Sequence, residues 1–170
     1  MRIISLVPSL TEYLWALGLE QEVVGITKFC IHPEQWWKTK TRVGGTKQLH
    51  FDTIQQLQPT LIIANKEENT KEDVEFLQSK YEVLLTDIIH LDDAFFYLLE
   101  IGERVNRVEA ARSLVEQIKK DLPKDFKLDV ALDQTIFIKK SVSEVAETLL
   151  LSLVLVILII YLFFCSIFGS

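Results

Sequence analysis

The chain has 170 residues, of which 49% are hydrophobic, and a net charge of −6 at pH 7. Its length suffices for one domain of ordinary size. The basic residues are scattered rather than gathered on one face, so we expect no nucleic-acid partner. The two cysteines, Cys30 and Cys165, exclude a framework of disulfides. The N-terminal apolar run carries one positive charge and ends at Pro8, which is not the pattern of a secretory signal peptide.

Short apolar runs alternate with helical patterns over the first half of the chain. The runs predict buried strands at residues 3–7, 23–26, 61–64 and 83–85. Helices are expected over residues 10–17, 51–57 and 71–80, with Ser9 and Asn69 as N-caps and Gly18 after the first helix. Residues 27–47, which include Pro33 and Gly44-Gly45, are expected to form a long loop. The alternation predicts an α/β fold, a single Rossmann-like lobe with a parallel sheet covered on both faces.

One long helix is expected next, from residue 92 to 122. Apolar residues recur at helical spacing there, Asp92 or Asp93 precedes them as an N-cap, and Pro123 follows. A helix of about thirty residues is much longer than the mean for globular proteins, so it would bridge two lobes or lead to a membrane.

The C-terminal segment has the composition of a single membrane-spanning helix over residues 149–168. Of these 20 residues, 16 are Leu, Ile, Val or Phe, and none is charged. At a rise of about 1.5 Å per residue they would extend roughly 30 Å, the thickness of a bilayer core. Lysines precede this segment and no basic residue follows it, which places the N-terminal part in the cytoplasm by the positive-inside rule.

The loops that follow the predicted strands are where a ligand site is expected, because ligands of parallel α/β sheets lie at the carboxyl ends of the strands. Cys30 and His32, with Glu67 and Glu68, offer possible metal ligands, but two ligands two residues apart do not define a site, and the sequence favours a buried or merely polar loop cysteine. Residues 66–69 form either a polar wall that contacts a ligand or a solvated turn capped at Asn69. No nucleophile with a nearby base is visible, so we do not expect an enzyme.

Trp36 and Trp37 have two interpretations as well. They would line a flat face that binds a ligand, or they would cover an edge of the sheet.

Four segments together resemble the class III substrate-binding proteins of ABC transporters, the helical-backbone metal receptors that bind cobalamin, haem and iron-siderophores. The segments are IISLVPSLTE at residue 3, VGITKFCIHP at residue 24, VGGTK at residue 43 and PTLIIANKEEN at residue 59. The resemblance covers residues 1–118. It implies a lobe of Rossmann type, a bridging helix over residues 92–122, and a small-molecule ligand that is cobalamin-like or a metal chelate.

The same resemblance implies specific site residues. The ligand wall would consist of Pro8, Ser9, Phe29, Cys30, His32, Lys47, Lys66, Glu67 and Glu68. Glu72 would be the surface carboxylate that docks on an ABC permease.

Residues 119–165 resemble a different family, the resistance-nodulation-division efflux transporters. The segments that carry this resemblance are LPK at residue 122, DQTIFI at residue 133, SVSEV at residue 141 and YLF at residue 161. In that family the chain before this helix lies in the periplasm, the opposite of the orientation that the lysines indicate. The second lobe of a class III protein would begin where this segment stands.

We therefore expect a truncated binding-protein lobe tethered to the membrane, with an ABC permease as a candidate partner. The alternatives are a fragment of an efflux transporter, which would associate with intact transporters, and a non-functional product of fusion or frameshift.

Overall fold

The computed structural model describes residues 1–122, 145, 147–150 and 152–153. The chain divides into two compact units, Met1–Phe126 and Lys127–Ser170. In the second unit, the described residues are helical and exposed. The predicted membrane span at residues 149–168 lies mainly outside the described residues, and among those that are described no helix is both long and apolar enough to cross a membrane.

The first unit is built on a five-stranded sheet with the order β3-β2-β1-β6-β7. All of its pairings are parallel. The four predicted strands are confirmed as β1 (Ile3–Ser5), β2 (Val23–Ile26), β6 (Leu61–Asn65) and β7 (Val83–Thr86). The fifth strand, β3 (Thr41–Arg42), is too short and polar to show an apolar run in the sequence. The predicted α/β class with a parallel sheet is therefore confirmed for this unit.

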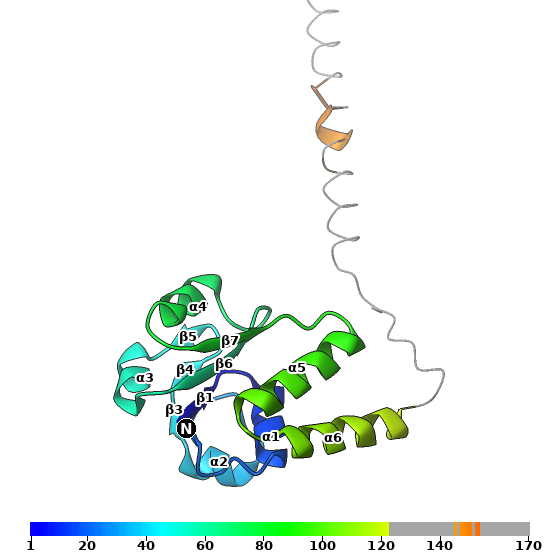
Figure 1. Cartoon of the computed structure of the whole chain (residues 1–170). Coiled ribbons are helices and arrows are strands. Elements are labelled where there is room, and N and C mark those ends of the chain that lie inside the picture. Colours follow the sequence, from blue (N-terminus) through cyan, green and yellow to red (C-terminus); the bar gives the residue numbers. More distant parts are fainter. Residues whose placement is uncertain (123–144, 146, 151, 154–170) are drawn as a thin grey trace, which may run out of the picture. The chain divides into compact units, whose positions relative to one another are not determined.

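Helices cover both faces of this sheet, as Figure 1 shows. Successive strand residues point to opposite faces, so Ile3 and Ile63 join one apolar cluster while Ile4 and Ile62 join the other. The first cluster packs against α1 (Pro8–Ala16), α2 (Glu34–Thr39), α5 (Leu91–Arg104) and α6 (Val108–Asp121). The second packs against α3 (Phe51–Leu57) and α4 (Lys71–Gln78). Residues on both faces are fully buried, which explains why the strands read as continuous apolar runs.

The predicted N-caps of α1, α4 and α5 are wrong, and α5 has His90 as its N-cap in place of Asp92 or Asp93. Helix α1 begins two residues earlier than expected, with Val7 as N-cap and Pro8 in the first turn, where a missing N–H costs nothing. Helix α4 is capped by Thr70, whose hydroxyl accepts a hydrogen bond from the Asp73 amide at 3.2 Å. The predicted role of Gly18 is confirmed, because it follows Leu17, the C-cap of α1, and has φ = 71°.

The segment expected to be a long loop contains regular structure. It holds α2, β3 and the first strand of a hairpin of β4 (Gly44–Gly45) and β5 (Gln48–Leu49). Trp36 of α2 is fully buried in the first apolar cluster, with its ring edge-on to Trp15 at 5.4 Å. Trp36 is therefore a core residue, and it does not line an exposed ligand face.

The single long helix expected over residues 92–122 is wrong, because α5 and α6 are separated by a tight turn. Asn106 has φ = 56°, the left-handed conformation that ends a helix. The Arg107 amide donates to the Gly102 carbonyl at 2.7 Å, and the Asn106 amide donates to Glu103 at 3.2 Å. These two bonds form a Schellman motif, which turns the chain back and packs α6 against α5.

Gly102 permits this close packing of α5 and α6. A Cβ atom at this position would lie 2.3 Å from the Ala111 Cβ. We expect Gly102→Ala to lower the free energy of unfolding by about 1–3 kcal/mol, because overpacking outweighs the gain in helix propensity. Urea denaturation would measure the change, and Glu103→Ala, on the exposed side of α5, should change it little. The double variant Gly102→Ala/Ala111→Gly should recover most of the loss, and a stable single variant would contradict this account.

Tyr13 connects α1 to α5. It is 9% exposed, and its hydroxyl donates to the Leu98 carbonyl at 2.7 Å. Burial raises the pKa of Tyr13 to about 12. The folded state therefore keeps this proton at a pH where the unfolded chain, with a tyrosine pKa of about 10, has lost it. The resulting contribution to stability is complete below pH 10 and is lost as the pH rises toward 12.

We expect Tyr13→Phe to lower the free energy of unfolding at pH 7 by about 1 kcal/mol, through loss of the hydrogen bond. Between pH 9 and 11 the free energy of the wild type should fall more steeply than that of the variant, because only the wild type contains this titrating phenol. Urea denaturation at a series of pH values would compare the two slopes. Parallel slopes would show that the Tyr13 pKa is not raised in the folded protein.

Candidate functional site

The carboxyl ends of the parallel strands form one edge of the sheet, and the chain changes direction there. From β1 the chain adds β2 and β3 on one side, and then β6 and β7 on the other. The switch point therefore lies between β1 and β6, where α/β sheets open a crevice for ligands. The loops beside it are the start of α1, residues 27–33 after β2, and residues 66–70 after β6.

The structure brings most of the predicted wall residues to this edge. Pro8 is half-buried and Ser9 exposed in the first turn of α1. Phe29 is 50% exposed, and His32, Lys47, Lys66 and Glu67 are also exposed. Glu68 is half-buried. Glu72 lies exposed in the first turn of α4, and its contact with a permease stays a prediction.

Two asparagines hold the loop after β6 in place. The Asn65 side-chain oxygen accepts hydrogen bonds from the amides of Glu67 and Glu68, at 2.8 and 3.2 Å. The Asn69 side-chain oxygen accepts from the Asn65 amide at 2.9 Å, and its nitrogen donates to the Thr46 carbonyl at 2.9 Å. Asn69 thus ties this loop to the β4–β5 hairpin. Asn69 is therefore not the helix cap that was predicted, and with 5% of its surface exposed it does not belong to a solvated turn.

A cavity of about 350 Å³ opens on the side of β2 and the hairpin. It brings together two predicted residues, Phe29 and Lys47. The other lining residues are Lys28, Gly45, Thr46 and Gln48. Lys28 was not among the predicted wall residues. Its position two residues after a buried strand, next to Phe29, is a signal in the sequence that could have indicated it.

Cys30 lies beneath this edge and is fully buried. Its Sγ atom lies 3.1 Å from Thr11 Oγ1 and 3.2 Å from Thr27 Oγ1, and Thr11 Oγ1 also lies 2.7 Å from Ser5 Oγ. The thiol therefore belongs to a buried polar cluster that joins β1, α1 and the loop after β2. This confirms the interpretation of Cys30 as a buried loop residue and removes its side chain from the exposed wall.

The structure does not assemble the metal site that Cys30 and His32 suggested. Within the described part of the chain, no three His, Cys, Asp or Glu side chains are grouped closely enough to hold a metal ion.

The charges of the loop after β6 are partly compensated. Lys66 pairs with Asp87 at 2.6 Å, and this hydrogen bond, together with the Asp87 charge, raises the pKa of Lys66. Partial burial, followed by the neighbouring Glu67 charge, raises the pKa of Glu68. The edge thus presents carboxylates beside β6 and ammonium groups beside β2.

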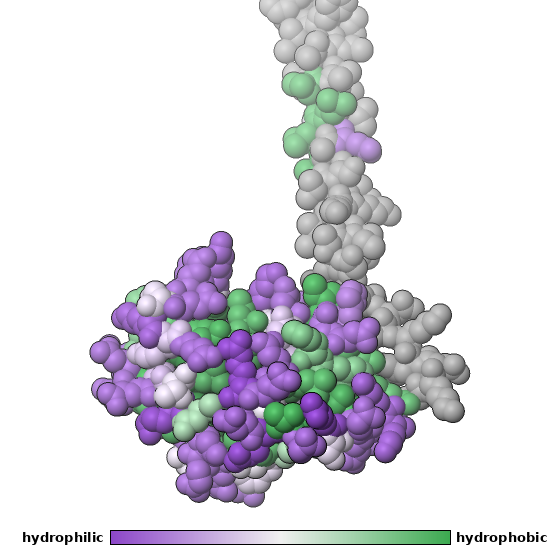
Figure 2. Space-filling model, in the orientation of Figure 1, coloured by the Kyte–Doolittle hydropathy of each residue, from purple (hydrophilic) through white to green (hydrophobic). Residues whose placement is uncertain are grey.

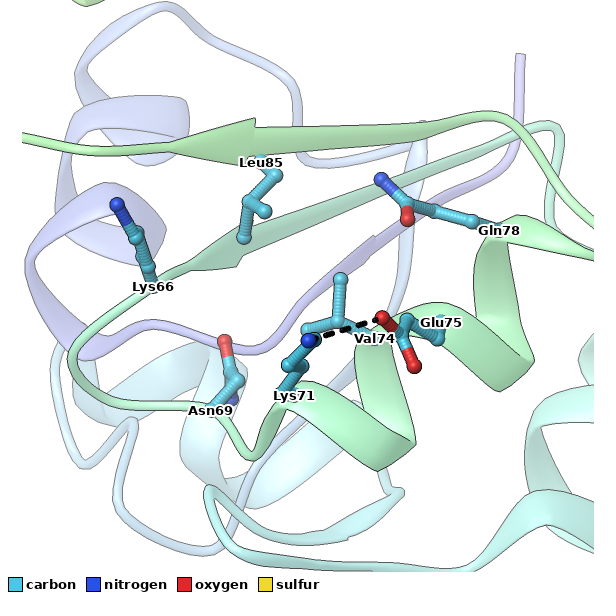
Figure 3. Close-up of a pocket in the computed structure, with 7 residues that line it drawn as sticks. All are labelled: Lys66, Asn69, Lys71, Val74, Glu75, Gln78 and Leu85. Atoms are coloured by element: carbon cyan, nitrogen blue, oxygen red, sulfur yellow. Dashed lines mark ion pairs between the residues drawn. The ribbon is translucent and has the colours of Figure 1, made fainter.

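A second cavity, of about 290 Å³, lies beside α4 (Figure 3). Val74 and Leu85 face each other at its centre, and Lys71 and Glu75 form an ion pair on its rim at 3.6 Å. Lys66, Asn69 and Gln78 complete the lining. Lys66 is its only predicted wall residue, so this cavity lies largely apart from the edge described above.

Comparison with known proteins identifies the family of the first unit. The model of the family "Periplasmic binding protein" matches residues 3–127. A second model, of the AcrB/AcrD/AcrF family, matches residues 100–168, so the two matches overlap over residues 100–127.

Individual relatives agree with the first match. An uncharacterized ABC transporter substrate-binding lipoprotein, YvrC of Bacillus subtilis, is 28% identical over 125 residues, which are 71% of this chain and 39% of the relative. The vitamin B12-binding protein of Yersinia pestis is 27% identical over 119 residues, 69% of this chain and 42% of the relative.

A solved structure shows the same fold. It is described as a possible iron-binding (periplasmic solute-binding) protein from Staphylococcus epidermidis, and it superposes with a TM-score of 0.63 at 26% identity. The match covers 74% of this chain and 53% of that one. The chain spans about two fifths of the length of the two curated relatives. With a family model that matches residues 3–127, the chain belongs to the periplasmic binding protein family.

Proposed function

We propose that the first unit forms one wall of a binding site for a cobalamin-like or metal-chelate ligand. The observation that carries this proposal is the arrangement at the carboxyl edge of the sheet, where Phe29 and Lys47 line an open cavity beside β2 and Asn69 ties the hairpin to the loop after β6. Membership of the periplasmic binding protein family supports it, and so does the name of the vitamin B12-binding relative. Its role is binding and delivery, with an ABC permease as the proposed partner.

The exposed Phe29 ring is the main apolar contact in this proposal. Half of its surface is accessible, and the ring stands at the mouth of a cavity of about 350 Å³. A flat macrocycle or an aromatic chelate would cover the ring and remove it from water. Aromatic residues contribute large contact area at small entropic cost, which makes Phe29 a suitable anchor.

We expect calorimetric titration of the full chain with cyanocobalamin, haemin and a ferric siderophore to detect binding of at least one of them. Phe29→Ala should weaken that binding about tenfold, because it removes the aromatic anchor. Phe76→Ala is a matched control, since Phe76 is a similarly exposed ring on α4, where it packs against Phe51. Absence of heat with all three ligands, or equal losses in the two variants, would exclude this function.

We further propose that residues 149–168 tether the chain to a membrane, with the N-terminal part in the cytoplasm. The support is the uncharged apolar composition of this segment and the lysines that precede it. A second candidate function, a fragment of an efflux transporter, is favoured by the match of residues 100–168 to the AcrB/AcrD/AcrF family. That resemblance implies the opposite orientation.

A labelling experiment separates these two proposals. In a Cys165→Ser background, we expect Ser170→Cys to react with a membrane-impermeant maleimide on intact cells, because the C-terminus would lie outside. Reaction only after the cells are permeabilised would support the orientation of the efflux transporter. Recovery of the chain in the fraction without membranes would contradict both.

A further inference from the structure

Two lysines, Lys28 and Lys47, line the cavity beside β2 without an acidic partner among the described residues. Four other lysines form ion pairs: Lys38 with Glu34, Lys66 with Asp87, Lys71 with Glu75, and Lys119 with Glu116. Over the residues that the structure describes, no carboxylate lies within ion-pair distance of Lys28 or Lys47. Both are exposed and both line the same cavity of about 350 Å³. The cavity is therefore locally basic on a chain whose net charge is −6.

The backbone holds Lys28 against the hairpin that carries Lys47. The Lys28 amide donates to the Gly44 carbonyl at 2.8 Å, and the two glycines pair with β5 as strand β4. On the other side of the hairpin, Asn69 donates to the Thr46 carbonyl at 2.9 Å. Hydrogen bonds from Lys28 and from Asn69 thus hold the hairpin. They also fix the position of Lys47, which the hairpin carries, relative to Lys28.

An apolar surface lies directly beside these charges. The Lys28 Nζ atom stands 5.1 Å from the centre of the Phe29 ring. A Cβ atom on Gly45 would lie 3.2 Å from Lys28 Cε and 3.3 Å from Phe29 Cε2, so the absence of a side chain there keeps the space under both groups open. The cavity therefore combines an exposed aromatic face, two ammonium groups and the polar side chains of Thr46 and Gln48.

This combination selects among ligand classes. Ammonium groups only donate hydrogen bonds, so a ligand that covers them must supply acceptors, and anionic oxygens make the strongest of these bonds. A ligand without such oxygens would cover two charges and leave them unpaired, at a cost in free energy. A flat apolar body that carries carboxylates satisfies both the Phe29 ring and the lysines.

We propose that the ligand of this site carries carboxylate groups on a flat apolar body, and that Lys28 and Lys47 bind those carboxylates while Phe29 contacts the body. This inference rests on the proposed function and specifies its ligand class. It assigns a ligand-selecting role to Lys28.

Haemin and its dimethyl ester form a matched pair of probes, because the ester has the same ring system without the two carboxylates. Cyanocobalamin is a third probe, a macrocycle without free carboxylates. Binding of each would be measured with the full chain and with Lys28→Gln and Lys47→Gln. Lys38→Gln is the control, since it removes the same charge from an exposed position on α2, away from the cavity.

We expect the wild type to bind haemin more tightly than the ester. Each cavity variant should weaken haemin binding about three- to tenfold and change ester binding less than about twofold, while Lys38→Gln changes neither. Raising the ionic strength from 0.05 to 0.5 M should weaken haemin binding by the wild type more than by the double variant. Circular dichroism would confirm that the variants are folded.

Other outcomes would overturn the proposal. Equal affinity of the wild type for haemin and its ester, or equal losses in Lys28→Gln and Lys38→Gln, would show that the lysines do not select the ligand. Tight binding of cyanocobalamin with weak binding of haemin would overturn this inference and leave the proposed function intact. No binding of any probe would remove both.

Discussion

Burial of both faces of the parallel sheet is the constraint on which the rest of the structure depends. In β1 and β6 the side chains of one face pack under α1 and α5, and those of the other face pack under α3 and α4. No strand face is therefore left to meet a ligand, and the chemistry of the lobe is confined to the loops at the strand ends. The strand order then favours one position at that edge for a ligand. The chain leaves β1 toward β2 on one side and later adds β6 on the other side, so the connecting segments separate between β1 and β6.

The loops at the carboxyl edge of the sheet form a site only if their own conformation is also fixed. Asn65 and Asn69 supply it through side-chain bonds to the backbone of their own loop and of the hairpin. Each such bond contributes only about 1 kcal/mol to stability. Its larger effect is on binding, because a loop ordered before the ligand arrives loses less entropy when the ligand binds. The surface around this frame is mostly hydrophilic in the view of Figure 2, with apolar residues gathered near α5, where Phe96 is 61% exposed.

The sequence and the structure agree where the signal was local and apolar. Strand β2 and helix α3 were predicted to the residue, because burial shapes their composition directly. The failures concern features that the spacing of apolar residues does not encode. The break at Asn106 depends on hydrogen bonds at the end of α5. Gly102 allows α5 and α6 to pack closely, but the sequence does not show that Ala111 is the residue opposite it. Helical spacing continues across that turn, so periodicity alone could not reveal it.

The candidate site shows the same division. Phe29, Lys47 and the loop after β6 were predicted from the resemblance and lie at the expected edge. The role of Lys28 and the hydrogen bond between Asn69 and Thr46 were not predicted, because both depend on how the hairpin approaches β2 and β6. The burial of Cys30 also follows from tertiary packing, since its thiol completes a cluster with Thr11 and Thr27 that no spacing in the sequence indicates.

Charge acts differently on this lobe at long and at short range. A net charge of −6 repels an anion that approaches from a distance. At physiological ionic strength this repulsion is screened beyond about 8 Å, so it slows the encounter more than it weakens the bound state. Within the cavity, Lys28, Lys47 and the Phe29 ring line the space that the proposed ligand would occupy. In the proposed site, selection among ligands would depend on those few side chains, and the net negative charge of the chain does not argue against an anionic ligand.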